Sequence, residues 1–297
     1  MTRRALIVAF GLLTGSVAQS GHAGEWLVTP QLTVGGGYED NPLGLASGES
    51  NRVSSAFLRT APGLELSLFA TPTVEWRAEA NYDRVEFAES QVGPRDTVAL
   101  RLERRWIGPT DEASVSMDGG TYRDGGRSSD DETWLALDPW WRWTLADPAW
   151  SLRAGLRLQE TWFDESNTEE TSTTLRLGPS WQSSQSTTWW LDGSLSFASA
   201  TAEDSDYTAW GVAAGVDRWL TAKILLYAQA SLDQQEYSAG GSERPILFEV
   251  GCRYRMQPWL EWFGAAVWDD PGSTSGDDQS WSAQLGLRWA QDIRLSD

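Results

Sequence analysis

The chain has 297 residues, of which 40% are hydrophobic and 22% are charged, so it is too apolar for an intrinsically disordered chain. Its 42 acidic residues outnumber the 23 basic ones, and the formal charge of −19 argues against a nucleic-acid partner recognised through its phosphates. Cys252 is the only cysteine and His22 the only histidine, which excludes an internal disulfide framework and cysteine-cluster metal sites.

Residues 1–23 have the pattern of a secretory signal peptide. Arg3 and Arg4 precede a short apolar run at 5–13, and small and polar residues follow it. The alternative, a membrane anchor, needs a longer run, because a helix must cross about 30 Å of hydrocarbon. We therefore predict an exported chain whose mature part, 24–297, contains no histidine. Histidine-dependent triads and metal sites then cannot form, so we expect no catalytic residue, no metal and no cofactor.

Hydrophobic and polar residues alternate along the mature chain, which is typical of β-strands with two unlike faces. The clearest apolar series is Trp150, Leu152, Ala154, Leu156 and Leu158. The alternating segments run to about 10–15 residues, beyond the common strand length of about 5–6 and enough for the roughly 9–11 residues of a membrane-spanning strand. Many of the 19 tryptophans lie near segment ends, as in the aromatic girdles of outer-membrane barrels. The sequence predicts an all-β fold, a transmembrane antiparallel up-and-down β-barrel in the bacterial outer membrane. A secreted β-sandwich, β-helix or propeller is the alternative.

Two kinds of chain break separate the alternating segments. Six are short turns, at 70–72, 108–110, 146–148, 183–185, 221–222 and 257–258. Seven are longer and mostly acidic, at 39–52, 88–96, 124–132, 164–171, 201–206, 238–244 and 269–279. Together they predict fourteen strands, with both termini and the short turns on the periplasmic side, as in other bacterial barrels. The acidic runs are interpreted either as solvated loops, or as sites for divalent-cation bridges to lipopolysaccharide and an attractive field for cations.

If the apolar positions face lipid, the intervening positions line the lumen. The inward basic residues are then Arg59, Arg77, Arg101, Arg105, Arg142, Arg153, Arg157, Arg176, Arg253 and Arg288. The inward acidic residues are Glu65, Glu75, Glu79, Asp83, Glu103, Asp118, Asp138, Asp192, Asp217, Asp233 and Glu249. These charges nearly balance, so fourteen strands are compatible with a narrow polar pore and with a salt-bridged, partly closed lumen. Arg104 and Arg218 fall in lipid-facing positions near predicted periplasmic turns, where an arginine costs little.

Three inward arginines are the main candidates for a functional site. Arg153 and Arg157 share one strand, with Gly155 leaving room between them, and Arg176 is expected on the next strand. They are predicted to form a basic stripe that sets the constriction of the lumen. The predicted partners across the lumen are Glu103, Asp118, Asp138 and Asp192. The inward rings of Trp134, Trp140 and Trp190 are candidates for stacking on sugars, with packing against the wall as the alternative.

Two short segments carry a family resemblance. Residues 35–42, Gly-Gly-Gly-Tyr-Glu-Asp-Asn-Pro, and residues 62–66, Pro-Gly-Leu-Glu-Leu, resemble the first two strands of the outer-membrane porin 2 type of β-barrel. The resemblance is specific over about 40 residues and generic beyond them. It implies a passive pore or polysaccharide conduit associated with exopolysaccharide export, and it brings no catalytic residues. One departure is that the chain continues past Trp289 through 290–297, whereas barrels usually end on an aromatic residue that the insertion machinery recognises. Either Trp289 serves with a tail, or insertion uses a different signal.

The leading functional hypothesis is a passive pore or a (poly)saccharide export conduit. The alternative is a structural or adhesive barrel with a closed, salt-bridged lumen. An enzyme is not expected, because the chemistries of outer-membrane enzymes usually rest on a histidine base. The expected partners are outer-membrane lipid and lipopolysaccharide, saccharides and the barrel insertion machinery, with no nucleic acid.

We predict that a conducting lumen prefers cations modestly, because the acidic loops concentrate cations at one mouth. Reversal potentials of the reconstituted protein in a salt gradient measure this preference. Anion selectivity would contradict it, and would mean that the inward arginines control the narrowest part.

Overall fold

The computed structural model describes residues 25–42, 53–126, 131–164, 168–201, 206–270, 272 and 279–295. The predicted signal peptide, 1–23, lies outside these residues, as do the central parts of several predicted loops. The long strands are β1 (Glu25–Glu39), β2 (Ser55–Thr71), β3 (Val74–Phe87), β4 (Arg95–Ile107), β5 (Asp111–Asp124), β6 (Glu132–Thr144), β7 (Trp150–Phe163), β8 (Thr168–Ser184), β9 (Thr187–Ala200), β10 (Tyr207–Trp219), β11 (Ile224–Tyr237), β13 (Ile246–Gln257), β14 (Leu260–Asp270) and β15 (Ser280–Ala290). Two short strands, β12 (Ser242–Glu243) and β16 (Ile293–Leu295), complete the set. The described residues contain no helix long and apolar enough to span a bilayer.

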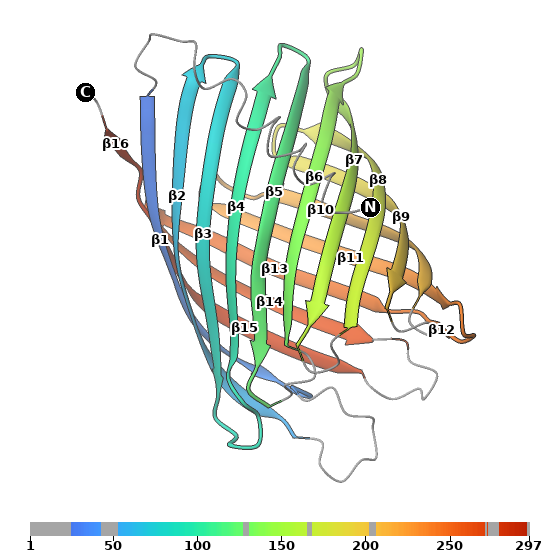
Figure 1. Ribbon diagram of the computed structural model, residues 1–297. Coiled ribbons are helices and arrows are strands. Elements are labelled where there is room, and N and C mark those ends of the chain that lie inside the picture. Colours follow the sequence, from blue (N-terminus) through green and yellow to red (C-terminus); the bar gives the residue numbers. More distant parts are fainter. Residues whose placement is uncertain are drawn as a thin grey trace.

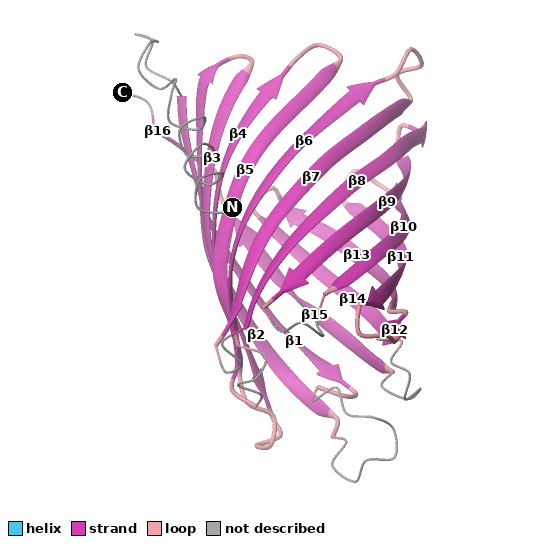
Figure 2. Cartoon of the chain, turned by 45° about the vertical axis from the view of Figure 1, so that its right-hand side comes forward, coloured by secondary structure: helices cyan, strands magenta, loops and turns pink. Residues whose placement is uncertain are grey.

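The fourteen long strands form one closed antiparallel ring. Each pairs with its neighbours in chain order, and β1 pairs with β15 to close the ring. In Figure 1, β1 to β8 form the near wall and β13 to β15 cross behind it, and Figure 2 shows the same barrel turned by 45°. The predicted count of fourteen strands is confirmed. The long strands begin and end close to the turns and loops that the sequence predicts. The short turns share one end of the barrel with the first residues of β1.

The C-terminal tail extends the seam of the barrel. Past Trp289 the chain resumes as β16, which pairs antiparallel with Trp26–Val28 at the start of β1 (Figure 1). The Thr29 hydroxyl donates to the Asp292 carboxylate at 2.9 Å, which fixes the residues between β15 and β16. The tail therefore adds backbone pairs to β1, where β15 has already ended. Whether the insertion machinery recognises Trp289 stays a prediction.

The two faces of the ring have opposite character. The outer face is apolar, and Leu100 and Leu285 are each 60% exposed there. The inner face buries polar groups instead, with Ser116 fully covered and Glu75 3% exposed. A soluble sandwich needs a dry apolar core between its sheets. Among the described residues the buried hydrophobic side chains are only Val92, Ala136, Ala198 and Ala209. The sandwich alternative is therefore wrong, because the apolar faces of these strands point away from the interior.

Replacing Leu100 by Arg should destabilise the barrel strongly. Leu100 lies near the middle of β4 and projects outward, so an arginine there meets the bilayer midplane and costs about 2–4 kcal/mol. The matched control is Leu145→Arg in the turn between β6 and β7, where the cost falls to about 0–1 kcal/mol. Urea unfolding of both variants in lipid vesicles measures the difference. Equal costs at the two positions would contradict a membrane-facing β4.

Candidate functional site: the barrel lumen

A ladder of ion pairs crosses the inner wall from β2 to β6, near the short turns. Arg77 lies 3.1 Å from Glu65 and 3.1 Å from Glu75. Arg105 lies 3.0 Å from the other oxygen of Glu75. Glu112 then joins two arginines, Arg105 from β4 and Arg142 from β6. Antiparallel register builds this ladder, because it sets oppositely charged inward residues beside each other on neighbouring strands. The charges in the ladder balance, so this part of the wall is neutral and cross-linked.

The three arginines predicted to form one stripe do lie together. The register of β7 and β8 places Gly155 opposite Arg176 and Arg153 opposite Gly178. Arg157, two positions beyond Gly155 on the same face, completes the group. That these residues set the constriction stays a prediction.

Arg157 and Arg153 have different partners, although they lie on the same strand. Arg157 donates to both carboxylate oxygens of Asp118 at 3.0 and 3.2 Å and lies 3.7 Å from Asp138. Asp118 and Asp138 belong to β5 and β6, so they approach along the wall rather than from across the lumen. The physical reason is that adjacent strands lie only about 4.8 Å apart, so a long arginine side chain on β7 reaches the carboxylates of both β6 and β5. Arg153 instead lies 4.8 Å from the centroid of the Trp140 ring, and within the described part of the chain it forms no ion pair.

Of the other two predicted acidic partners, Glu103 forms an ion pair and Asp192 does not. Glu103 lies 3.8 Å from Arg101 of its own strand and accepts a 2.6 Å hydrogen bond from Ser114 of β5. These contacts too run along the wall and not across the lumen. Asp192 lines a cavity together with Arg153 and Arg176, but no ion pair of 4.0 Å or less links it to another described residue.

The inward aromatic rings lie against glycines. Trp134 faces Gly120 on β5, and a Cβ placed on Gly120 would come within 2.7 Å of the ring. Trp190 covers Gly215 on β10 in the same manner. Each ring therefore packs one face on the wall, while Trp140 has Arg153 over its ring. Sugar stacking on Trp134, Trp140 or Trp190 stays a prediction that needs the face turned to the lumen.

Arg95 is a lumen residue that the sequence reasoning missed. It lies 3.1 Å from Asp124 of β5 and 3.3 Å from Glu39 of β1, and it donates to the carbonyl oxygen of Pro42. It thus ties the start of the first long loop to the wall at the loop end of the barrel. Arg95 is an even number of positions from the inward Arg101 and Arg105 on β4, so the alternation of the strand would have identified it as inward. The turn and loop pattern instead predicts a loop over residues 88–96.

The inside of the barrel holds two polar cavities among the described residues. One, of about 240 Å³, is lined from β6 to β11 and includes Arg153, Arg176, Asp192 and Asp233. The other, of about 450 Å³, is lined by inward residues of β1 to β3 and of β11 and β13 to β15. In the second cavity Glu249 accepts hydrogen bonds from Tyr227 at 2.9 Å and from Gln229 at 2.6 Å.

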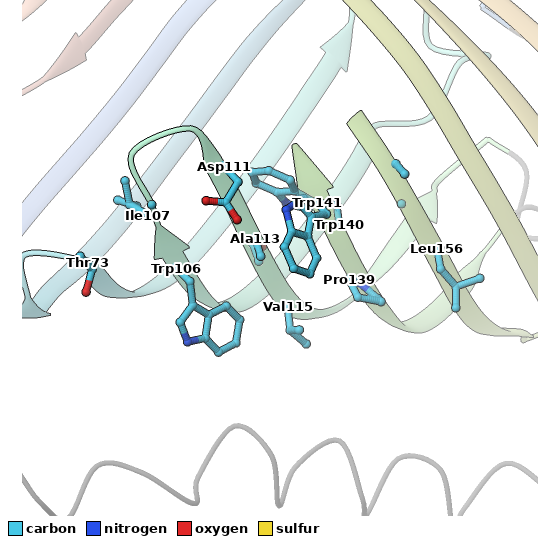
Figure 3. A pocket seen from close by; sticks show the side chains of 14 residues that line it. Thr73, Trp106, Ile107, Asp111, Ala113, Val115, Pro139, Trp140, Trp141 and Leu156 are labelled. Atoms are coloured by element: carbon cyan, nitrogen blue, oxygen red, sulfur yellow. The ribbon is translucent and has the colours of Figure 1, made fainter. Parts of the chain in front are cut away.

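Larger hollows lie on the outer face and are apolar. One of them, of about 880 Å³, is lined by Trp106, Val115, Pro139, Trp141 and Leu156 (Figure 3). Trp106, Val115, Pro139 and Leu156 all occupy outward positions, so lipid chains are the natural filling. Arg104, predicted to face lipid near a turn, does so, and its guanidinium lies between the rings of Trp76 and Trp106 at 5.1 and 4.7 Å.

Replacing Glu112 by Gln should weaken the ladder. The Glu112 side chain is 8% exposed, and its loss of charge leaves Arg105 and Arg142 without their shared partner, at a cost of about 1–3 kcal/mol. The control Glu86→Gln removes a carboxylate that is 56% exposed and paired with Arg84 on the outer face, at a cost of about 0–1 kcal/mol. Urea unfolding in lipid vesicles compares them. If Glu112→Gln were as mild as Glu86→Gln, the ladder would not stabilise the wall.

The chain matches no protein-family model and no curated protein, so the porin 2 resemblance stays a prediction. Solved structures share its fold. An OmpT of Vibrio cholerae lacking loop L8, an outer membrane protein, has a TM-score of 0.59 at 10% identity, over 91% of this chain and 100% of that one. The outer membrane channel DcaP of Acinetobacter baumannii has 0.54 at 10% identity, over 92% and 99%. A bacterial polysaccharide outer membrane secretin has 0.51 at 10% identity, over 89% and 98%. The chain thus has the closed fourteen-stranded antiparallel fold of outer-membrane β-barrels.

Proposed function

We propose that this barrel is a passive channel for hydrophilic solutes across the outer membrane. The observation that carries the proposal is the pair of polar cavities inside a closed ring, lined by inward charged and amide side chains from both walls. Arg153, Arg176 and Asp192 form no ion pair with another described residue, and all three are exposed. Charges without partners are stable where water solvates them, which supports a hydrated lumen over a closed one. The ion-pair ladder lines only the wall from β2 to β6. The wall from β7 to β11 carries Arg153, Arg176, Asp192 and Asp233, which are not part of the ladder.

A saccharide is one solute class that fits this lining. Sugar rings present apolar C–H faces and many hydroxyls. The smaller cavity offers Trp140 beside Asp138 and Asp192, and the larger one offers the amides of Gln31, Asn81 and Gln284. One structural neighbour is described as a polysaccharide outer membrane secretin and another as an outer membrane channel, which agrees with a transport role here. Partners follow from the same proposal. Lipid and lipopolysaccharide surround the apolar outer face, and the acidic loops hold divalent cations against lipopolysaccharide phosphates. The barrel insertion machinery assembles the protein.

The channel is tested with two neighbouring cysteine variants of β14. Ala265 lines the larger lumen cavity, whereas Ala266 projects outward beside it. Cys252 is first replaced by Ser, so that each variant carries one thiol. Planar bilayers should show discrete conductance steps, and a bulky charged thiol reagent should reduce them by half or more in Ala265→Cys. The same reagent should leave Ala266→Cys unchanged, because lipid covers that position.

Two outcomes would overturn the channel. The absence of any conductance from correctly folded protein would favour the alternative, a structural or adhesive barrel with a closed lumen. Equal block of Ala265→Cys and Ala266→Cys would mean that the current does not pass through the lumen.

A further inference from the structure

The smaller lumen cavity is a recess in the wall, with a floor of small residues. Gly155 of β7, Ser194 of β9, Ala213 of β10 and Ser231 of β11 line it, and none carries a long side chain. Large residues at these inward positions would fill the space. The sequence therefore leaves a hollow of about 240 Å³ in this part of the wall.

The β7–β8 side of the recess is basic and uncompensated. Seven other inward arginines lie within 4.0 Å of a carboxylate, namely Arg59, Arg77, Arg95, Arg101, Arg105, Arg142 and Arg157. Arg153 and Arg176 have no such neighbour in the part of the chain that the structure describes. The guanidinium of Arg153 lies over the Trp140 ring. A guanidinium stacked in this way keeps its in-plane N–H groups free, in the fork geometry that binds a carboxylate.

Asp192 of β9 and Asp233 of β11 are the carboxylates of the recess that form no ion pair among the described residues. The carboxyl group of Asp192 lies over Gly178, and that of Asp233 lies over Gly211, where a Cβ would come within 2.8 and 3.1 Å of the respective carboxyl carbons. Both carboxylates thus lean over glycines of neighbouring strands. No arginine of the described chain lies within 4.0 Å of either one.

We propose that this recess binds a small zwitterionic solute, of the size of an α-amino acid, during passage. Its carboxylate lies against Arg153 and Arg176, and its ammonium group lies against Asp192 and Asp233. Two arginines and two carboxylates that form no ion pair among the described residues line one hollow, whereas the third lining carboxylate, Asp138, lies 3.7 Å from Arg157. A ligand with both charges can therefore meet opposite charges at both of its ends, whereas an anion or a cation also faces like charges.

The volume limits the ligand further. At about 240 Å³ the recess is smaller than the roughly 300–1,000 Å³ of sites for drug-sized ligands, so one small molecule fits and an oligosaccharide does not. The proposal rests on the channel proposed above for access to the recess. It concerns a different solute class from the saccharides suggested by the tryptophans.

The test compares four molecules of nearly equal size: L-alanine, a zwitterion; L-lactate, an anion; L-alaninol, a cation; and L-lactamide, which is neutral. Radiolabelled uptake into proteoliposomes gives the flux of each, and saturation-transfer NMR on the protein in nanodiscs gives binding without requiring flux. In the native protein alanine should bind, and its flux should saturate and exceed that of lactamide by about threefold or more.

Two double variants test the arginines and the carboxylates of the recess separately. Arg153→Gln with Arg176→Gln should lower alanine flux to the lactamide level and raise that of alaninol. Asp192→Asn with Asp233→Asn should lower alanine flux likewise and raise that of lactate. The matched control is Arg253→Gln, an inward arginine that lies 5.4 Å from the Tyr227 ring outside the recess, and it should leave the alanine preference intact.

The outcomes distinguish the two proposals. Flux of lactamide without any alanine preference or binding would overturn the recess and leave the channel standing. Alanine binding without flux of any solute would support the recess and overturn the channel. Loss of the alanine preference in Arg253→Gln to the same extent as in the paired variants would show that lumen charge in general, and not the recess, selects the solute.

Discussion

The closure of the backbone hydrogen-bond network is the constraint on which the rest of the structure depends. A bilayer offers no water to unpaired N–H and C=O groups, so strands in lipid must form a ring without an edge. Here the ring closes where β1 meets β15, from Gln31 opposite Ala290 to Glu39 opposite Ser282. The short β16 extends this closure along the first residues of β1, and the Thr29–Asp292 hydrogen bond holds the junction. Because each long strand is paired on both sides, the loss of any one pairing opens the ring.

Closure turns one face of every strand inward, and the inward face must then satisfy its polar groups without a hydrophobic core. Two solutions occur around the circumference. From β2 to β6 the charges satisfy one another in a ladder, with Glu75 and Glu112 each shared by two arginines. From β7 to β11 glycines and other small residues separate the charges, so that Arg153, Arg176 and Asp192 remain available to a solute. One wall is thereby neutral and cross-linked, and the other is polar and hollow.

Glycine has a specific function on the inner face of both walls. In the strand pairs Gly120 with Trp134 and Gly215 with Trp190, the missing side chain leaves the space that a neighbouring ring occupies. The same device lets Asp192 and Asp233 lean over Gly178 and Gly211. A ring or carboxylate held against the wall leaves more of the lumen to water than one that projects into it. The inward glycines therefore influence the width of the path as well as the local packing.

The sequence by itself determined the barrel, the number of strands and the face of almost every residue. These properties are local: a side-chain period of two and the positions of turns can be read from neighbours in the chain, and Arg104 shows that even an outward charge follows the same phase. Only the tertiary structure decided which charges meet. Arg153 and Arg157 look alike in sequence, two positions on either side of Gly155, yet Arg157 is bound by Asp118 and Asp138 while Arg153 lies on Trp140. That difference depends on the register between strands and on the direction in which each side chain leans, and both arise from pairings that join distant parts of the chain.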